Sequence, residues 1–235
     1  MQHVLERGFV LKIIRIKFKK DATVRFISHL DMMKAFQRAI RRAGLEAEYS
    51  HGFNPQMQMV FGAPLSLGFT SEAEYADLSF SKDYNPDLVV EKMNKVLPTG
   101  LMILDAGERK IKTNIMADIR SAGYSFKIGP DLQADKMASI INDAESLPVD
   151  KTRKGKTKTV DVRRLIFTAT GEDNILKVFV SAGNQNNLNP RLLTEALSNY
   201  LNLVVEGSRY NRTEQFVERE GNMVSPLDSV ALETK

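Results

Sequence analysis

The sequence predicts an α+β fold, and three observations lead to this expectation. Some short stretches alternate apolar and polar residues as strands do, longer segments repeat apolar residues at helical spacing, and Gly and Pro separate the two kinds. The chain has 235 residues, of which 43% are hydrophobic and 26% charged. This composition is typical of a protein with a packed core, and the length suits two units of about 100 residues each.

The first half begins with a predicted strand over residues 11–20. Its apolar residues Ile14, Ile16 and Phe18 alternate with Arg15, Lys17 and Lys19, which predicts a half-buried strand with a basic outer face. Ser28 followed by Asp31 predicts a capped helix start, and Gly44 ends that helix. The remaining predicted elements are strands at 57–61 and 73–80, a helix from Asn85 through Leu97, and a strand at 101–105.

The second half repeats this order less clearly. It reads as a strand at 124–128, a helix at 131–147, a hairpin of 160–168 and 174–181, a helix at 190–201, and a last strand near 203–210. A β–α–β–β–α–β order is that of the ferredoxin-like fold. We therefore predict two tandem ferredoxin-like units, at 11–105 and 121–215, joined by a linker at 106–120 and followed by a tail at 216–235 that frays from about Asn222.

The composition excludes several kinds of site. The chain has no cysteine, so it offers no disulfide, thiolate metal site, iron–sulfur ligand or cysteine nucleophile. The three histidines lack metal-ligand spacing and no nucleotide-binding glycine motif is present, so we expect no metal and no cofactor. No apolar run reaches the roughly 18 residues of a membrane span. No signal cleavage site is present either, so we expect a cytoplasmic protein.

The N-terminal residues 1–10 have a second interpretation. Leu11 can be encoded by TTG, an alternative bacterial start codon, and Glu6-Arg7-Gly8 can be encoded by a purine-rich run that resembles a ribosome-binding site. We therefore expect residues 1–10 to come from an over-extended gene start, with a genuine N-terminal extension as the alternative.

Positive charge is concentrated in two places. Residues 12–42 hold ten Lys or Arg against two Asp, and four of the ten lie at helical spacing opposite the apolar face: Lys34, Arg38, Arg41 and Arg42. Five more stand in the predicted loop at 151–158: Lys151, Arg153, Lys154, Lys156 and Lys158. Such groups favour a phosphate backbone. Solvated surfaces, or pairing with Glu46, Glu48 or other acids, remain the alternatives.

Two histidines are candidates for chemistry. His29 lies at a predicted helix start beside Asp31 and close to Arg25, where it could act as a general base or contact a nucleic acid. Arg25 itself is a further candidate for nucleic-acid binding. Alternatively, Ser28 and Asp31 only cap the helix and His29 packs locally. His51 begins the turn-rich stretch His51-Gly52-Phe53-Asn54-Pro55, which is either a binding loop or a structural connection.

An amide-rich loop precedes the last predicted helix. Its members Asn186, Asn187 and Asn189 could pair with base edges, although Asn is also a common cap and turn residue. Arg212 follows the last predicted strand, and the sequence indicates no role for it.

The sequence resembles an uncharacterised bacterial family described as radical-SAM-linked proteins. The resemblance spans about residues 11–215 and is carried by RFISHLDMM (25–33), HGFNP (51–55), NNLNPRLL (186–193) and RTEQF (212–216). The residues that match the family's pattern have no assigned roles: Arg25, Ser28, His29, Asp31, Gly52, Phe53, Asn54, Pro55, Gly68, Ser71, Glu72 and Glu74. Gln56-Met57 stands where the family usually has a further Pro step.

The resemblance implies a partner rather than a reaction. We expect an RNA-binding accessory protein that works with a separate radical SAM enzyme in tRNA or rRNA modification. We expect this chain to be the partner of an enzyme rather than an enzyme in its own right. One alternative is a protein–protein adaptor of that enzyme, anchored through Phe53, Phe61 and Tyr75. Another is a metal-independent endoribonuclease that uses His29 or His51.

Overall fold

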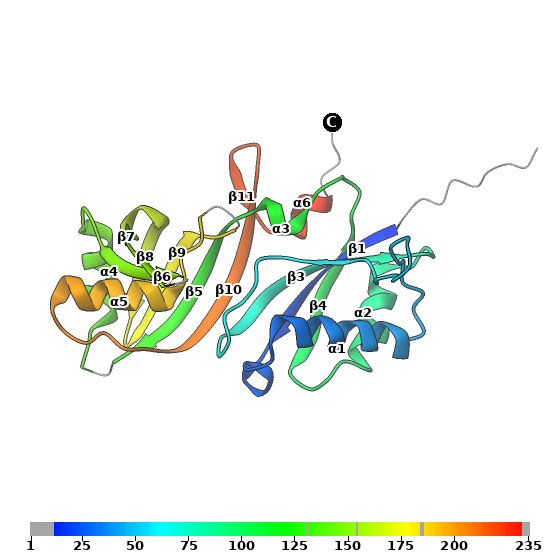
Figure 1. Cartoon of the computed structure of the whole chain (residues 1–235), viewed down its shortest axis with the longest axis horizontal. Coiled ribbons are helices and arrows are strands. Elements are labelled where there is room, and N and C mark those ends of the chain that lie inside the picture. The colour runs from blue at the N-terminus through cyan, green and yellow to red at the C-terminus, as the bar shows by residue number, and fades with distance from the viewer. Residues whose placement is uncertain (1–11, 130, 154, 184–185, 232–235) are drawn as a thin grey trace, which may run out of the picture.

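The computed structural model describes residues 12–129, 131–153, 155–183 and 186–231 (Figure 1). Within these residues it contains six α-helices, two short 3-10 helices, a nine-stranded mixed sheet and a separate two-stranded sheet. The α+β class expected from the sequence is confirmed. The hypothesis about residues 1–10 lies outside the described residues.

The first half has the expected order of elements. These are β1 (Lys12–Lys20), the 3-10 helix η1 (Ala22–Val24), α1 (His29–Arg42), β2 (Met59–Phe61), β3 (Thr70–Phe80), α2 (Pro86–Asn94) and β4 (Leu101–Glu108). The strands pair antiparallel in the order β4-β1-β3-β2. Ile14, Ile16 and Phe18 of β1 pack with Phe36 and Ile40 of α1 in one hydrophobic core.

The expected basic outer face of β1 is wrong at one position. Arg15 is buried, and its guanidinium donates to both carboxylate oxygens of Asp77, at 2.6 and 2.9 Å. It also donates to the Pro226 carbonyl at 3.0 Å. A strand's alternation predicts which side a residue faces, but not what later covers that side.

The second half contains four main strands, two longer helices and two helices of four residues or fewer. Its elements are α3 (Ile115–Asp118), β5 (Ile119–Ile128), α4 (Ala134–Asp143), the 3-10 helix η2 (Arg163–Leu165), β8 (Ile166–Glu172), β9 (Ile175–Ser181), α5 (Pro190–Leu201) and β10 (Gly207–Arg219). Their strand order is β10-β5-β9-β8, again antiparallel. The last strand is longer than expected because residues past 210 continue the pairing with β5.

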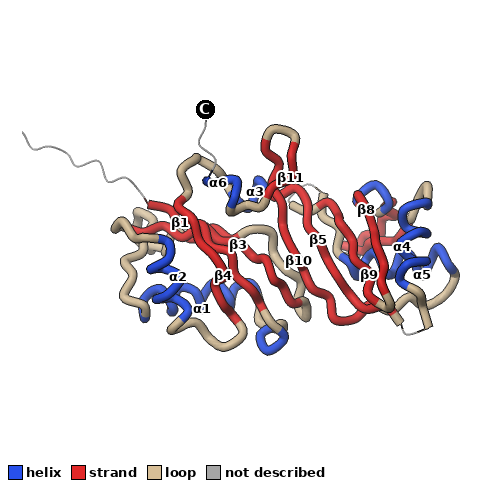
Figure 2. Tube along the Cα trace, turned by 180° about the vertical axis from the view of Figure 1, so that it is seen from behind, coloured by secondary structure: helices blue, strands red, loops and turns tan. Residues whose placement is uncertain are grey.

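The two halves share one sheet. β3 and β10 run parallel and pair at two positions, Thr70 with Asn211 and Ser71 with Arg212. Helices α1 and α2 cover one face of the first half, and α4 and α5 cover one face of the second. Figure 1 shows α1 and α5 with their N-terminal ends toward the middle of the molecule, and Figure 2 shows β5 and β10 from the opposite side.

The basic segment 151–158 is a hairpin rather than the expected loop. Strands β6 (Pro148–Arg153) and β7 (Lys156–Asp161) form the separate two-stranded sheet, which lies beside α5. Val149 and Val162 are buried and anchor its base. Gly155, with φ +73°, supplies the backbone conformation that the tight turn needs.

The C-terminal segment is ordered rather than fraying. It forms β11 (Asn222–Val224), which pairs with β10, and α6 (Asp228–Ala231). Val230 and Ser229 are buried against the face of the first half that carries Arg15. The expected tail is therefore part of the fold from residue 216 to residue 231.

Candidate functional site

The basic stripe of α1 comprises Lys34, Arg38, Arg41 and Arg42, and all four side chains are exposed. The opposite face of the helix packs into the core through Phe36 and Ile40. In the described part of the chain, no carboxylate forms an ion pair with the first three, and Glu46 instead pairs with Lys82. Arg42 donates to the Val96 carbonyl at 2.7 Å. Three cations of the stripe are thus available to an external anion.

The basic hairpin, residues 148–161, has an unusual arrangement of charge. Its register pairs Lys151 with Lys158 and Arg153 with Lys156, so four basic positions share one face. Lys151, Lys156 and Lys158 are exposed. Like charges directly opposite each other destabilise a strand pair. On the opposite face Thr152 and Thr157 share a 2.9 Å hydrogen bond, and the Thr159 hydroxyl donates to the Asp150 carboxylate at 2.6 Å. Lys154 lies outside the described residues.

Ser28 and Asp31 form the expected cap of α1. The Ser28 hydroxyl accepts from the Asp31 backbone N–H at 3.1 Å and donates to the Asp31 carboxylate at 2.7 Å. These two side chains are therefore accounted for by helix capping.

His29, the first residue of α1, lies partly buried behind this cap. Its ring meets Phe61 edge-on at 5.6 Å, and among the described residues its Nδ1 is buried without a hydrogen-bond partner. Burial lowers the pKa of His29, an effect that Glu74 opposes and Lys20 reinforces. Because Nδ1 is enclosed, any chemistry or ligand contact must use Nε2.

His51 lies at the other end of the first half. Residues 51–56 form an exposed turn closed by the bridge between Tyr49 and Met57, and Phe53 at its tip is fully exposed. Ala47, four positions before His51, forms a bridge with Phe80 at the end of β3. Glu74, which acts on the pKa of His29, lies toward the start of β3. The two histidines therefore do not share a site.

Glu74 and Arg212 form a buried ion pair between the two halves. The guanidinium is 2.8 Å from the carboxylate and also donates to the Tyr124 hydroxyl and to the carbonyls of Ala63 and Pro64. Both side chains are almost completely buried. This motif pair holds β3, β10 and the 62–69 loop together. Glu72, by contrast, is exposed and accepts from Asn211 at 3.3 Å.

The amide-rich loop divides into separate roles. Asn189 caps α5, and its Nδ2 donates to Ser66 of the first half at 3.0 Å. Asn186 lines an open depression of about 610 Å³ with Arg120, Phe167 and Met223. Asn187 is exposed.

Of the three side chains expected to anchor an adaptor interface, Phe53 is exposed and the other two are not. Phe61 and Tyr75 are buried, and the Tyr75 hydroxyl donates to Glu214 at 2.6 Å. An interface through this region would have to use Phe53 without them.

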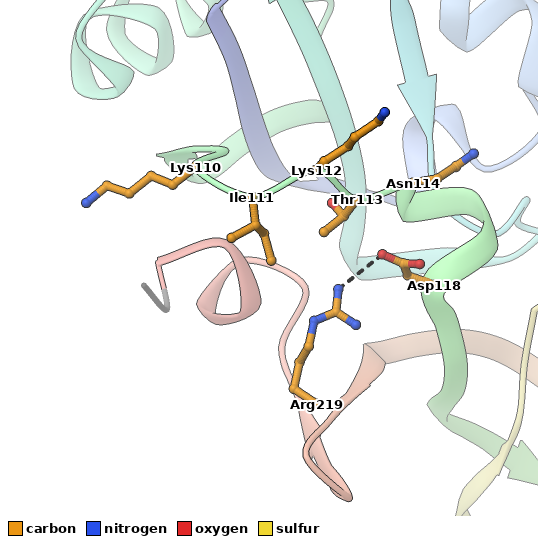
Figure 3. A pocket seen from close by; sticks show the side chains of 7 residues that line it. All are labelled: Lys110, Ile111, Lys112, Thr113, Asn114, Asp118 and Arg219. Carbon is orange, nitrogen blue, oxygen red and sulfur yellow. Dashed lines mark hydrogen bonds and ion pairs between the residues drawn. The ribbon is translucent and has the colours of Figure 1, made fainter. Parts of the chain in front are cut away.

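An open depression lies beside α3, in the segment expected to be a linker. It measures about 790 Å³ and is lined by residues 110–114, Asp118 and Arg219. Figure 3 shows Arg219 facing Asp118, with which it forms a 3.1 Å ion pair, while Lys110 and Lys112 extend away from that pair. The lining cations therefore do not converge on one ligand position.

Two residues of the family pattern, Arg25 and Gly68, meet three residues that the sequence analysis did not single out where the halves join: Phe26, Leu67 and Arg191. We call Arg25, Phe26, Leu67, Gly68 and Arg191 the seam surface. Arg191 of α5 donates to the Leu67 carbonyl at 3.0 Å, and the Gly68 backbone N–H donates to the Arg25 carbonyl at 2.9 Å. The available sequence signal was an aromatic residue next to an arginine in a short loop, Arg25-Phe26.

Comparison with known proteins places the chain in a family. Residues 13–190 match the family described as an uncharacterized protein conserved in bacteria (DUF2344). The chain belongs to the DUF2344 family. The DUF2344 match includes the basic stripe, the basic hairpin and the loop up to Pro190, and it ends before β10. No curated protein matches the chain.

No helix in the described residues is long and apolar enough to cross a membrane. The same residues contain no group of three or more His, Cys, Asp or Glu side chains arranged to hold a metal ion.

Proposed function

We propose that the chain binds structured RNA through the basic stripe of α1 and the basic hairpin, as an accessory to a separate radical SAM enzyme that modifies that RNA. The observation that carries the proposal is the lack of internal partners for the charge of the stripe. Lys34, Arg38 and Arg41 are exposed and form no ion pair within the described residues. Like charges at helical spacing destabilise a helix by roughly 0.2–0.5 kcal/mol per pair, and an external polyanion would remove that repulsion.

The basic hairpin supports the same function independently. Its register sets Lys151 opposite Lys158 on an exposed face, while the contacts of the acidic residue Asp150 lie on the other face, to Thr159. A two-stranded ribbon with cations on one face is well suited to a phosphate backbone, because each neutralised phosphate releases a counterion.

The proposal includes the fold of each half. The antiparallel orders β4-β1-β3-β2 and β10-β5-β9-β8, each with two helices on one face, support a pair of ferredoxin-like units, the second carrying the basic hairpin as an insertion. The radical SAM partner rests on the resemblance described above. Since this chain has no cysteine, the cluster of such an enzyme would be ligated by another polypeptide.

The test is RNA binding across a salt series. Each lost phosphate contact should reduce the slope of log K against log salt by about 0.7 for single strands and about 0.9 for duplex. A Lys34/Arg38/Arg41→Ala variant should therefore lose about 2 to 3 units of slope. The matched control is Lys82/Lys95/Lys136→Ala, which removes the same net charge from exposed positions elsewhere.

Two results would overturn the proposal. One is the absence of binding by the unmodified chain at low salt. The other is an equal loss of slope in the stripe variant and its control, which would make the effect one of net charge alone. Co-purification with the enzyme from nuclease-treated extract, without RNA binding, would favour the adaptor alternative.

A further inference from the structure

The seam surface exposes apolar groups where the two halves meet. Phe26 is 70% exposed and Leu67 is 54% exposed, and Leu30 on the first turn of α1 is 58% exposed. Buried aromatic side chains such as Phe69 lie directly behind them. Phe26 adjoins Gly68, the residue that follows Leu67, so two exposed apolar side chains lie close together, and exposed apolar groups that gather in a patch are typical of a binding surface.

The backbone on both sides of Phe26 is held in place. Lys20 is buried, and its Nζ donates to the carbonyls of Arg25 and Ile27, each at 3.2 Å. The Gly68 backbone N–H donates to the same Arg25 carbonyl. Three hydrogen bonds to the carbonyls of Arg25 and Ile27 thus hold the backbone that carries the Phe26 ring.

Gly68 lets the two halves approach each other at this ring. It has φ +83°, and a Cβ built there would lie 3.3 Å from Cε1 of Phe26 and 3.2 Å from Nη2 of Arg191. The ring from the first half and the guanidinium from α5 therefore flank one glycine. A side chain at position 68 would occupy the space between them.

Two guanidinium groups surround the apolar surface. The Arg25 guanidinium lies over one face of the Phe26 ring, 4.8 Å from its centre, which leaves the other face for a stacked base, and Arg191 lies over Phe69 at 4.9 Å. Within the described residues neither forms an ion pair with a carboxylate. The surface combines a flat apolar ring with uncompensated positive charge, and its ligand should carry the complementary groups.

We infer that the seam surface binds one unpaired nucleotide, with its base on Phe26 and its phosphate between Arg25 and Arg191. The inference rests on the proposed RNA binding and specifies which part of the RNA is read. A base inside a duplex has both faces covered by its neighbours, so only an unpaired base can stack on a protein ring. The surface also lies next to the helix that carries the basic stripe, because α1 begins three residues after Phe26.

The absence of tryptophan from the chain provides a direct assay. Phe26→Trp introduces a single tryptophan at the seam surface and keeps an aromatic ring there. Titration with a single-stranded RNA oligonucleotide should quench its emission saturably. The matched control is Tyr200→Trp, an exposed position near the other end of α5, which should show no saturable change. Phe26→Ala should weaken binding of the same oligonucleotide about 5- to 150-fold, the usual range for one stacked base. Because Phe26 is uncharged, its salt slope should stay unchanged.

The outcomes separate this inference from the proposed function. RNA that binds, as shown by anisotropy of a labelled oligonucleotide, but leaves the Phe26→Trp emission unchanged would overturn the inference and leave the proposed function standing. Quenching by poly-glutamate equal to that by RNA would also overturn it, because the surface would then accept acidic peptides. Failure of all RNA binding would remove both proposals together.

Discussion

Replacing Arg212 by methionine tests whether the buried ion pair holds the two halves together. Methionine keeps an unbranched stem but leaves the Glu74 carboxylate, the Tyr124 hydroxyl and the carbonyls of Ala63 and Pro64 without their donor. Breaking a buried pair by removing one partner costs about 3–5 kcal/mol, because the remaining charge has no compensation. Arg212 is 2% exposed, so solvent cannot supply that compensation.

The loss should be visible in both chemical and thermal unfolding. For a chain of this size each kcal/mol shifts the Tm by about 2–4 °C, so Arg212→Met should lower the Tm by about 6–20 °C. Urea unfolding of both proteins measures the free-energy difference directly. The double variant Arg212→Met/Glu74→Leu should be more stable than the single variant, because it also removes the uncompensated carboxylate.

Two outcomes would refute this reasoning. A loss below about 1 kcal/mol in Arg212→Met would place the pair in the range of surface salt bridges. A double variant less stable than Arg212→Met would mean that the cost does not come from the stranded carboxylate. Arg212→Met should also disturb the seam surface, because Ala63 and Pro64 belong to the loop that carries Leu67 and Gly68.

Three further predictions concern other parts of the fold. Because burial holds the pKa of His29 below its ordinary 6.5, the unfolded chain binds a proton more readily, so stability should fall as pH is lowered through 6.5. In His29→Asn the free energy of unfolding, measured with urea, should depend less on pH between about pH 7.5 and about pH 5.5. An equal pH dependence in the variant and the unmodified chain would contradict the burial argument. Ser28→Ala removes the α1 cap and should cost about 1 kcal/mol by the same assay, while Ser81→Ala, in an exposed turn, should cost less. Gly171→Ala would place a Cβ 2.0 Å from the Ala134 backbone and should cost about 1–3 kcal/mol or more, seen as a lower Tm; an unchanged Tm would mean that α4 can move away.

The sequence was informative where its apolar periodicity was undisturbed. The start of α1 at the Ser28 cap, the inward Phe36 and Ile40, and the alternation of Ile14, Ile16 and Phe18 were all predicted. These signals are local, since a cap or an amphipathic face depends on residues a few positions apart.

The sequence misled where a charge has a distant partner. Arg15 looks like a solvent-facing strand residue until Asp77 and the Pro226 carbonyl are placed beside it. Arg212 carried no meaning until Glu74 lay opposite, 138 positions away in the chain. Local patterns cannot identify such pairs, because the pattern of each residue alone is that of an exposed charge.

The basic hairpin was missed for a different reason. Both of its faces are polar, so the apolar alternation that identifies strands is missing between Val149 and Val160. Gly155 was the available turn signal. The seam surface was not recognised as a unit because its residues come from three segments of the chain, and Arg191 reaches Leu67 only in the folded structure.

β10 is translated near the end of the chain, and this has a consequence during synthesis on the ribosome. Until residues 207–219 emerge, the start of β3 has no neighbour on the β10 side, because β2 covers only positions 76–78. At about 5–20 residues per second, the 138 positions from Glu74 to Arg212 take roughly 7–28 s to translate. Unpaired strand edges invite pairing with other chains, and an inward-pointing charge discourages it. Glu74 should therefore protect the nascent first half from aggregation during that interval, before the same carboxylate closes the sheet with Arg212.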